Sequence, residues 1–437
     1  MEYEWGSRTG IPRLLGLKEP SDHPMAELWM GAHPKAPSQV KDGGRWVCLM
    51  DAIEKNPEDI LGRQTAEIHS NRLPFLFKIL AVEKPLSIQV HPGKSEACHG
   101  FKRESEQGVP IEAPQRSYRD KNHKSEIICA ISRFSMMAGF RSLDDIRRNV
   151  RRYCPESLKK QWGLFQSHLA PLGLKRFYHS VMTLSPDAGD RVIHEALSRA
   201  GVETDQGDET GAWMARLHKS YPRDMGVIAP LFFNLFSLEP GQAAYIPWGT
   251  PHCYLMGLGA ELMSNSDNVI RGGLTSKPMD IPEFLRVMDW EKIGGRKIKL
   301  VSEIKMAGGT DPETDPETGA ETGAETGAET GAGHLSGPKI IRPKKIGDGE
   351  RVYPTDSKEF RLSFIDGSQT ETRTVSSSQS VEILFCVDGR AAIRETDSGR
   401  ITRLGQGESV IVPGCVERYS IEGAAKIYKA SVPAFMS

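Results

Sequence analysis

The stretch that decides the fold is LSIQVHP, residues 86–92. Successive side chains of a β-strand point to opposite faces of the sheet. One face of this strand would be apolar, and the other would carry a hydroxyl, an amide and an imidazole from Ser87, Gln89 and His91. The apolar face predicts packing on a core. The polar face then either meets solvent or lines a polar cavity, and the cavity requires partners elsewhere in the chain.

The composition bounds the class of protein. A chain of 437 residues exceeds one compact core, so we expect two or three domains. Apolar residues make up 38% and charged residues 26%, which is typical of globular proteins. The formal net charge is −1, from 56 basic and 57 acidic side chains. This balance argues against nucleic acid or an anionic membrane surface as a partner.

The seven cysteines are scattered and form no C-x-x-C pair, so the sequence predicts neither a thiolate zinc site nor a disulfide framework. A reducing cytosol suits such a chain, and we expect a cytoplasmic protein. The N-terminal residues MEYEWGSRTG lack the basic and apolar regions of a signal peptide. No apolar run reaches the roughly 18 residues of a membrane span.

The chain alternates between strand-like and helical character. Short apolar runs such as FLFKIL and EIICAI predict strands up to about residue 141. SLDDIRRNVRRY then places Ser142 at a helix N-cap, with Asp145 three residues later. In SPDAGDRVIHEALSRAG, Pro186 lies just inside the predicted start and Gly201 just past the end. We therefore expect a helical insertion domain over residues 142–229.

The last third begins with a repeat, DPETDPETGAETGAETGAETGAG, at residues 311–333. Glutamates four residues apart would repel along a helix, and the glycines weaken a helix further. We interpret residues 306–338 as a disordered linker. Residues 339–437 return to strand-like patterns, with Asp388–Gly389 as a hairpin signal. They contain no histidine, so we expect a structural or interface domain without a second metal site.

Two other segments concentrate polar residues: YRDKNHKSE at 118–126, and PWGTPHCYLMGLGAELMSNSDNVIRGGLTSK at 247–277. Together with the opening strand they offer two imidazoles, a carboxylate and an amide oxygen, from Gln89, His91, Glu126 and His252. Such a set suits Zn²⁺, Mn²⁺, Co²⁺ or Fe²⁺. The spacing alone leaves open whether these are metal ligands or hydrogen-bonded core residues.

These segments resemble type I phosphomannose isomerase. That family shows Gln-x-His-Pro, Tyr-x-Asp-x-Asn-His-Lys-Pro-Glu, Pro-His-Ala-Tyr, Ser-Asp-Asn-Val and Arg-Ala-Gly-Leu-Thr. This chain has SIQVHP, YRDKNHKSE, TPHCYL and NSDNVIRGGLT in the same order, with YEWG and LPFLFKIL upstream. The resemblance extends to about residue 290, and more loosely over the C-terminal strands. Ser125, Cys253 and Gly272 depart from it. The family proline would stiffen the backbone before Glu126.

The resemblance implies a mainly β fold with a helical insertion. Residues 1–141 and 230–305 would form a cupin-type (jelly-roll) catalytic domain, and residues 339–437 a second, cupin-like domain. The implied enzyme is an aldose–ketose isomerase that interconverts mannose 6-phosphate and fructose 6-phosphate by proton transfer through an enediol. It would act on hexose 6-phosphates as a monomer, and supply mannose phosphates for GDP-mannose synthesis or mannose catabolism.

Family precedent also implies roles for the polar residues. One Zn²⁺ per chain would bind four ligands: Gln89, His91, Glu126 and His252. Lys124, two residues before a ligand, and its neighbour His123 are the acid/base candidates. The metal would stabilise an enediolate as a Lewis acid.

The remaining candidates are charged or polar groups near these ligands. Arg271 cannot serve as a base, and the paired N–H donors of its planar guanidinium (its fork) suit phosphate or an enediolate oxygen. By analogy, three residues would assist at the phosphate or the sugar: Lys78, Ser87 and Lys277. Glu261 and Asp267 would relay protons or orient Arg271, and the sequence does not choose between these roles.

Two other functions compete. A metal-dependent cupin dioxygenase also uses two histidines and a carboxylate, with open positions for O₂, but it needs neither Gln89 as a ligand nor so many nearby cations. A non-catalytic sugar-binding cupin would result if metal binding had been lost, yet all four ligand residues are present. A fused nucleotide-sugar transferase is unsupported because no Gly-rich nucleotide loop occurs.

Overall fold

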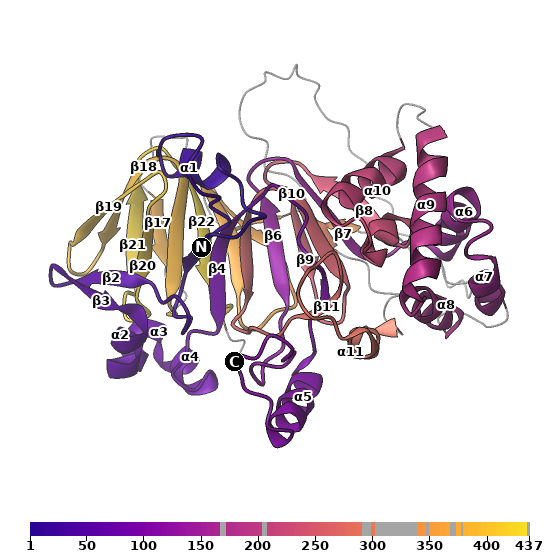
Figure 1. Cartoon of the computed structure of the whole chain (residues 1–437). Helices are drawn as coiled ribbons and strands as arrows, with labels where there is room; N and C mark the ends of the chain where they lie inside the picture. The colour runs from indigo at the N-terminus through magenta and orange to yellow at the C-terminus, as the bar shows by residue number, and fades with distance from the viewer. Residues whose placement is uncertain are drawn as a thin grey trace, which may run out of the picture.

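The computed structural model describes residues 1–166, 172–202, 208–290, 299–301, 339–341, 343–346, 349–367, 373–376 and 379–434. The predicted linker, residues 306–338, lies outside these ranges. Figure 1 shows two β regions side by side, with a group of helices at the outer end of the first. The chain is therefore mainly β with a helical insertion, as the sequence predicts.

The first β region is built around one long strand, β10. Its described strands are β1 (Glu27–Met30), β4 (Phe75–Val82), β5 (Ile88–Val90), β6 (Glu126–Ala130), β7 (Phe134–Phe140), β8 (Phe233–Leu238), β9 (Ala243–Ile246), β10 (His252–Ser264), β11 (Ile270–Gly273), β12 (Lys299–Val301) and β13 (Lys339–Ile341). The second half of β10 pairs with β4 and β6, and its first half pairs with β5 and β7. One strand thus joins two sheets, which closes the β structure around an interior.

Gly257 lies where β10 passes from one sheet to the other. Its φ of +132° is one that L side chains rarely adopt. A Cβ there would lie 2.6 Å from the carbonyl oxygen of Arg133. Glycine is needed because the bend brings two backbones into direct contact. His252, at the start of β10, is fully buried.

The strand predicted from LSIQVHP is present but short, spanning Ile88–Val90 as β5. Ile88 and Val90 are fully buried in a core that extends into the helical insertion. Gln89 points the other way, and its Cα pairs with that of His252. The predicted alternation is confirmed, and the polar face lines the interior of the β structure.

Helices fill the chain between β7 and β8: α6 (Leu143–Tyr153), α7 (Lys159–Gln166), α8 (Leu172–Met182), α9 (Pro186–Val202), α10 (Glu209–Ser220) and the 3₁₀ helix η1 (Met225–Leu231). The Ser142 side chain accepts a hydrogen bond from the Asp145 amide at 3.0 Å, which confirms the N-cap. Pro186 begins α9 as predicted. Gly201, however, lies within α9 rather than beyond its end. A single glycine inside a helix costs only about 1 kcal/mol relative to alanine, so tertiary packing can outweigh it.

Shorter elements surround the first β region: α1 (Gly10–Leu14), the hairpin β2 (Gln39–Asp42) and β3 (Arg45–Cys48), α2 (Leu49–Lys55), α3 (Pro57–Leu61), α4 (Arg63–Ile68), α5 (Lys94–Glu106) and α11 (Ile281–Val287). Of these, α5 and α11 bear on the candidate site. Helix α5 follows directly after residues 91–93. Helix α11 packs against β11, where the Phe284 ring lies over Gly272.

The second β region contains β14 (Lys344–Ile346), β15 (Glu350–Tyr353), β16 (Arg361–Asp366), β17 (Arg373–Ser376), β18 (Glu382–Glu395), β19 (Ile401–Gly405), β20 (Ser409–Val412), β21 (Arg418–Glu422) and β22 (Ala425–Ser431). The hairpin predicted at Asp388–Gly389 is wrong, because β18 runs through both residues. The register shifts between Cys386 and Asp388, and Gly389 has φ +80°. This β-bulge lies just before the Asp-Gly pair, so the left-handed glycine belongs to a continuous strand and not to a turn.

The two β regions share one hydrophobic core. Its members come from β4, β6 and β10 on one side and from β15, β16, β18 and β22 on the other. The rings of Phe77 and Phe385 meet edge to face, with centroids 6.5 Å apart. The Tyr353 hydroxyl donates to the Gly241 carbonyl at 3.0 Å. The C-terminal region is thus packed directly against the strands that carry the candidate site.

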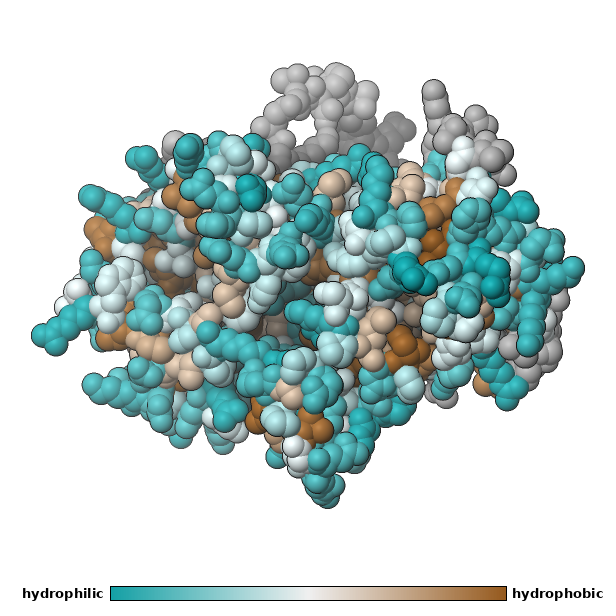
Figure 2. Space-filling model, in the orientation of Figure 1, coloured by the Kyte–Doolittle hydropathy of each residue, from teal (hydrophilic) through white to brown (hydrophobic). Residues whose placement is uncertain are grey.

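On the face in Figure 2, hydrophobic residues are scattered among hydrophilic ones. Across the described ranges, no helix is long and apolar enough to cross a membrane. All seven cysteines are free thiols.

Candidate active site

Three segments bring the four predicted ligands together inside the first β region. Gln89 lies on β5, and His91 follows it directly. Glu126 opens β6, where it pairs with Met263 of β10 and Ile246 of β9. His252 opens β10 opposite Gln89.

The side chains converge as well as the strands. Ligand atoms of His91, Glu126 and His252 all lie within 4.8 Å of one another. His252 Nε2 is 2.8 Å from Glu126 Oε1, and His91 Nε2 is 3.3 Å from Glu126 Oε2. The Gln89 amide lies 3.2 Å from His252 Nε2. A half-turn of that amide exchanges its nitrogen and oxygen, so Gln89 can offer an oxygen at the same place.

Both imidazoles are held with Nε2 facing the cluster. His91 Nδ1 lies 2.8 Å from the Asn268 carbonyl oxygen, and His252 Nδ1 lies 2.9 Å from that of Thr250. A carbonyl can only accept, so each Nδ1 donates its proton and the neutral ring keeps a lone pair on Nε2. Burial, with the Lys124 ammonium next in importance, lowers the pKa of His91 to about 3. Backbone carbonyls commonly orient metal-binding histidines in this way.

Glu126 is the ionised centre of the cluster. Burial alone would favour the neutral acid, but Lys124 and the two histidines hold the pKa of this carboxyl well below its usual range. The Tyr254 hydroxyl donates to Oε1 at 3.1 Å. The other oxygen, Oε2, is buried without a hydrogen bond. A buried carboxylate, two aligned imidazoles and an amide oxygen form a donor set that fits one divalent cation of the zinc type.

Lys124 lies against the same atoms. Its Nζ is 3.1 Å from Glu126 Oε2 and 3.1 Å from His91 Nε2, and the side chain is buried. An ammonium this close to two ligand atoms is placed to exchange protons with a molecule bound at the metal position. The structure therefore brings Lys124 into the site, as its sequence position suggests.

Behind the ligands lies a second buried charge group. Lys78 Nζ is 3.3 Å from Glu261 and 3.9 Å from Glu27, and it lies over the Trp29 ring. Burial disfavours the ammonium, but Glu27 and Glu261 outweigh it and raise the pKa of Lys78. Burial also raises the pKa of Glu261. Lys78 and Glu261 thus share an ion pair beside Tyr254, whose hydroxyl interacts with both Glu261 and Glu126.

A cationic group lies on the outer side of the site. Arg271 on β11 pairs with Gln89 of β5, next to the ligands. It is half-buried and makes no hydrogen bond or ion pair within the described residues. Burial and the nearby Arg119 lower its pKa. Burial, Arg271 and Arg119 likewise lower the pKa of Lys277. Three neighbouring cations form a place for an anion, although Arg119 also pairs with Glu112 at 3.4 Å. Ser87, two residues before Gln89, is half-buried on the same stretch.

Two predicted residues are placed elsewhere. His123 Nε2 lies 3.4 Å from Glu359 Oε2, in the C-terminal β region, so its ring is turned away from the ligands. Asp267 pairs with Lys35 at 2.7 Å and with His33 at 3.3 Å, which lower the pKa of its carboxyl. The structure does not bring either side chain into the cluster, because His123 contacts Glu359 and Asp267 contacts Lys35, both from distant segments.

Three residues that contribute to the site were missed from the sequence. Tyr254 donates to Glu126, Asn268 orients His91, and Arg119 extends the cationic group. Tyr254 was open to prediction, because it follows His252 by two residues and so shares its face of β10. Asn268 acts through its backbone carbonyl, for which side-chain chemistry gives no signal.

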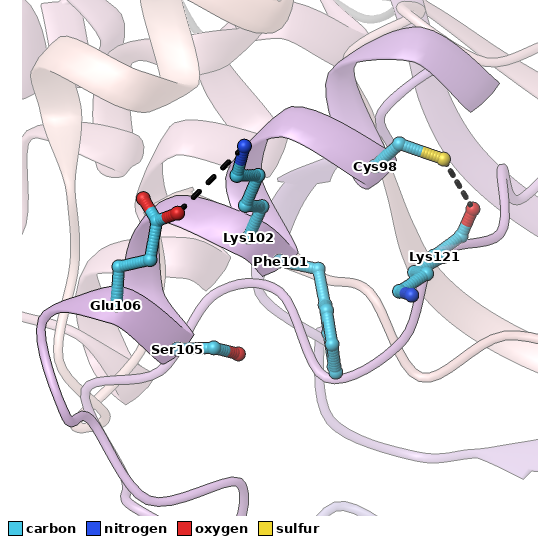
Figure 3. Close-up of a pocket in the computed structure, with 6 residues that line it drawn as sticks. All are labelled: Cys98, Phe101, Lys102, Ser105, Glu106 and Lys121. Atoms are coloured by element: carbon cyan, nitrogen blue, oxygen red, sulfur yellow. Dashed lines mark hydrogen bonds and ion pairs between the residues drawn. The ribbon is translucent and has the colours of Figure 1, made fainter.

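A separate surface pocket of about 580 Å³ is lined by Cys98, Phe101, Lys102, Ser105, Glu106 and Lys121. Figure 3 shows the Cys98 thiol donating to the Lys121 carbonyl, and Lys102 facing Glu106. These residues come from α5 and the loop beside it. None of the candidate site residues lines this pocket.

A β structure whose interior presents two oriented imidazoles, a carboxylate and an amide defines a metal-binding protein of the cupin type. A family model described as phosphomannose isomerase type I, catalytic domain, matches residues 1–143. The mannose-6-phosphate isomerase of Shigella flexneri is 33% identical over 426 residues, which cover 97% of this chain and 96% of that protein. The chain belongs to the type I phosphomannose isomerase family.

Other relatives agree with this assignment. The mannose-6-phosphate isomerase of Homo sapiens is 32% identical over 316 residues, covering 66% of this chain and 71% of that protein. A crystal structure of mannose 6-phosphate isomerase from Salmonella typhimurium, bound to fructose 6-phosphate as substrate and to zinc, superposes with a TM-score of 0.80. It is 31% identical and covers 99% of this chain and 97% of that one.

Proposed function

We infer that this chain is a zinc-dependent mannose-6-phosphate isomerase, which interconverts mannose 6-phosphate and fructose 6-phosphate. The observation that carries this is the convergence of His91, Glu126 and His252 within 4.8 Å, in a chain aligned over nearly its full length with such isomerases. A solved relative of the same fold holds both fructose 6-phosphate and zinc.

The metal ligands we propose are Gln89, His91, Glu126 and His252. When bound there, zinc supplies a Lewis acid that favours negative charge on the sugar oxygens. The chain contributes the ionised state of Glu126 and two imidazoles whose Nε2 atoms face the cluster. It also contributes the hydrogen bonds that fix this arrangement before any ligand arrives.

The reaction moves one proton between neighbouring carbons. In the aldose-to-ketose direction, a base removes the proton on C2 and a proton is delivered to C1, while the hydroxyl proton on O2 is lost and O1 gains one. We propose that Lys124 carries these protons, because its Nζ lies 3.1 Å from two ligand atoms inside the site. His123 is turned toward Glu359 and is not assigned this role.

The cationic group is proposed to bind the anionic parts of the substrate. Arg271 is nearest to the ligands in register and presents a planar fork, so it suits an enediolate oxygen. Lys277 and Arg119 extend the positive charge outward to the phosphate, with Ser87 as a hydroxyl donor. Lys78 pairs with Glu261 and Glu27. We therefore propose that Lys78 holds the Glu261 side chain in place and does not bind the phosphate.

Three further expectations stay predictions. A cytoplasmic location suits seven free thiols. A monomeric state and a role in supplying mannose phosphates for GDP-mannose synthesis or mannose catabolism rest on the family resemblance. Sedimentation of the purified protein measures the monomeric state directly.

The test is conversion of mannose 6-phosphate by purified, zinc-loaded protein in D₂O, with O₂ consumption followed in parallel. An isomerase forms fructose 6-phosphate, consumes no O₂, and incorporates solvent deuterium at C1. Consumption of O₂ would instead indicate a cupin dioxygenase. Sugar phosphate binding without turnover would indicate a non-catalytic sugar-binding protein.

A further inference from the structure

The segment that carries Lys124 and Glu126 is held from both sides. Residues 122–125 run without a turn into β6, so neighbouring side chains point to opposite sides of the backbone. Lys124 points at the metal ligands, and His123 points at the C-terminal β region. Any contact that fixes the His123 side chain therefore also fixes the direction of Lys124.

On the catalytic side the anchor is Asn268. Its Oδ1 accepts from the amides of Arg119 and Asp120, at 2.7 and 3.2 Å. Its Nδ2 donates to the Asn122 carbonyl at 2.8 Å. These bonds fix the backbone up to residue 122. The Ser125 carbonyl accepts from the Ser264 amide at 3.0 Å, so residues 123 and 124 lie between these two anchors.

On the other side the anchor is Glu359, which belongs to the C-terminal β region. Glu359 Oε2 lies 3.4 Å from His123 Nε2, and Oε1 accepts from Asn122 Nδ2 at 3.4 Å. The carboxylate is 14% exposed, so water screens this pair only weakly. His123 lowers the pKa of Glu359 despite its burial, so the carboxylate is ionised where it meets the ring.

The loop that presents Glu359 is itself rigid. Ser357 Oγ accepts from the amides of Glu359 and Phe360, at 3.2 and 3.3 Å. Phe360 is fully buried in the core that both β regions share. A fixed loop can impose its geometry on the segment it contacts, whereas a mobile loop would only follow it.

We propose that Glu359 is a positioning residue through which the C-terminal β region holds His123, and with it Lys124 and Glu126, in the geometry of the metal site. This gives the second β region a role in catalysis although it supplies no ligand. The inference rests on the proposed function for the role of Lys124, but its effect on metal binding can be measured without any sugar.

The experiment compares Glu359→Gln and His123→Gln with the wild type, alone and combined. The zinc dissociation constant is measured by competition with a chelator, and kcat and KM with mannose 6-phosphate. Outer residues that orient metal ligands typically contribute about 10- to 100-fold in affinity, and we expect the lower end, about tenfold, for each single variant. Because the two residues act as one pair, the double variant should be no weaker than either alone. We expect kcat to fall more than KM rises.

The matched control is Tyr353→Phe, which removes a different contact between the same two β regions. It should lower the melting temperature but leave the zinc affinity and kcat as in the wild type. If Glu359→Gln fails to fold, His123→Gln removes the same pair and serves alone.

Wild-type zinc affinity in Glu359→Gln would overturn the proposal. So would equal losses in Tyr353→Phe, because the effect would then be one of general stability. If wild-type protein failed to isomerise mannose 6-phosphate, the proposed function would fail, but the zinc measurements would still decide the role of Glu359.

Discussion

Replacing Arg271 by alanine separates chemistry from folding more cleanly than any other change in the site. Its guanidinium is half-buried and makes no hydrogen bond or ion pair within the described residues. The neighbouring charge that acts on it is another cation, Arg119. Removing it leaves no partner unsatisfied, so the free energy of unfolding should not fall. A loss of activity in Arg271→Ala can then be attributed to the substrate.

The size of the loss depends on what the fork binds. A donor aimed at charge that develops in the transition state is typically worth about 10²- to 10³-fold in kcat. Arg271 pairs in register with Gln89, beside the ligands, so we expect a loss of this size in kcat with a small change in KM. If the fork bound only the phosphate, KM would rise and kcat would largely survive. Arg271→Lys should rescue poorly, because a point charge cannot replace a planar fork.

The assay couples fructose 6-phosphate formation to a spectroscopic readout at saturating zinc, with the melting temperature measured alongside. The control is Lys277→Ala, which removes a more exposed cation of the same group and should raise KM. A wild-type kcat/KM in folded, zinc-loaded Arg271→Ala would refute both assignments of the fork.

Three further changes have expected outcomes. Gly272→Ala would place a Cβ 2.4 Å from the Phe284 ring, so it should destabilise the fold by about 1–3 kcal/mol in chemical denaturation, and Phe284→Leu should restore part of this. Arg286, Tyr118 and Arg103 outweigh burial and lower the pKa of Glu283 to about 2, so its ionised form stabilises the fold above the unfolded pKa, and this stability is lost as the pH falls toward 2. The cost of Glu283→Gln should therefore shrink by about 2 kcal/mol between pH 7 and pH 3. Deletion of residues 311–332, a polar repeat with little to pack, should leave kcat and KM near their wild-type values.

Local patterns in the sequence predicted the elements that local physics controls. The alternation in residues 86–92 gave both faces of β5, and the Ser142–Asp145 pair gave the start of α6. Asp388–Gly389 misled because a left-handed glycine can lie either in a turn or in a continuous strand beside a β-bulge. Choosing between them depends on the partner strand, here β22, which lies distant in sequence.

From the residues alone, metal ligands and hydrogen-bonded core residues stayed equally open, and the resemblance to the family supplied the ligand set. The structure brings His91, Glu126 and His252 together. Side chains that find distant partners were not open to prediction. His123 and Asp267 lie in the same motifs as true site residues, and only the fold shows that Glu359 and Lys35 hold them elsewhere. The sequence shows the chemistry of each side chain but not the distant residue that it contacts.

The central claim is that one zinc ion, held by Gln89, His91, Glu126 and His252, makes this chain an isomerase. The most direct test is to add zinc stepwise to metal-free protein while measuring both bound zinc and mannose 6-phosphate conversion. Activity should be absent at the start, rise in proportion to bound zinc, and level off at one zinc per chain, whereas Glu126→Ala should neither bind zinc tightly nor turn over. Full turnover by protein shown to contain no metal would contradict the claim.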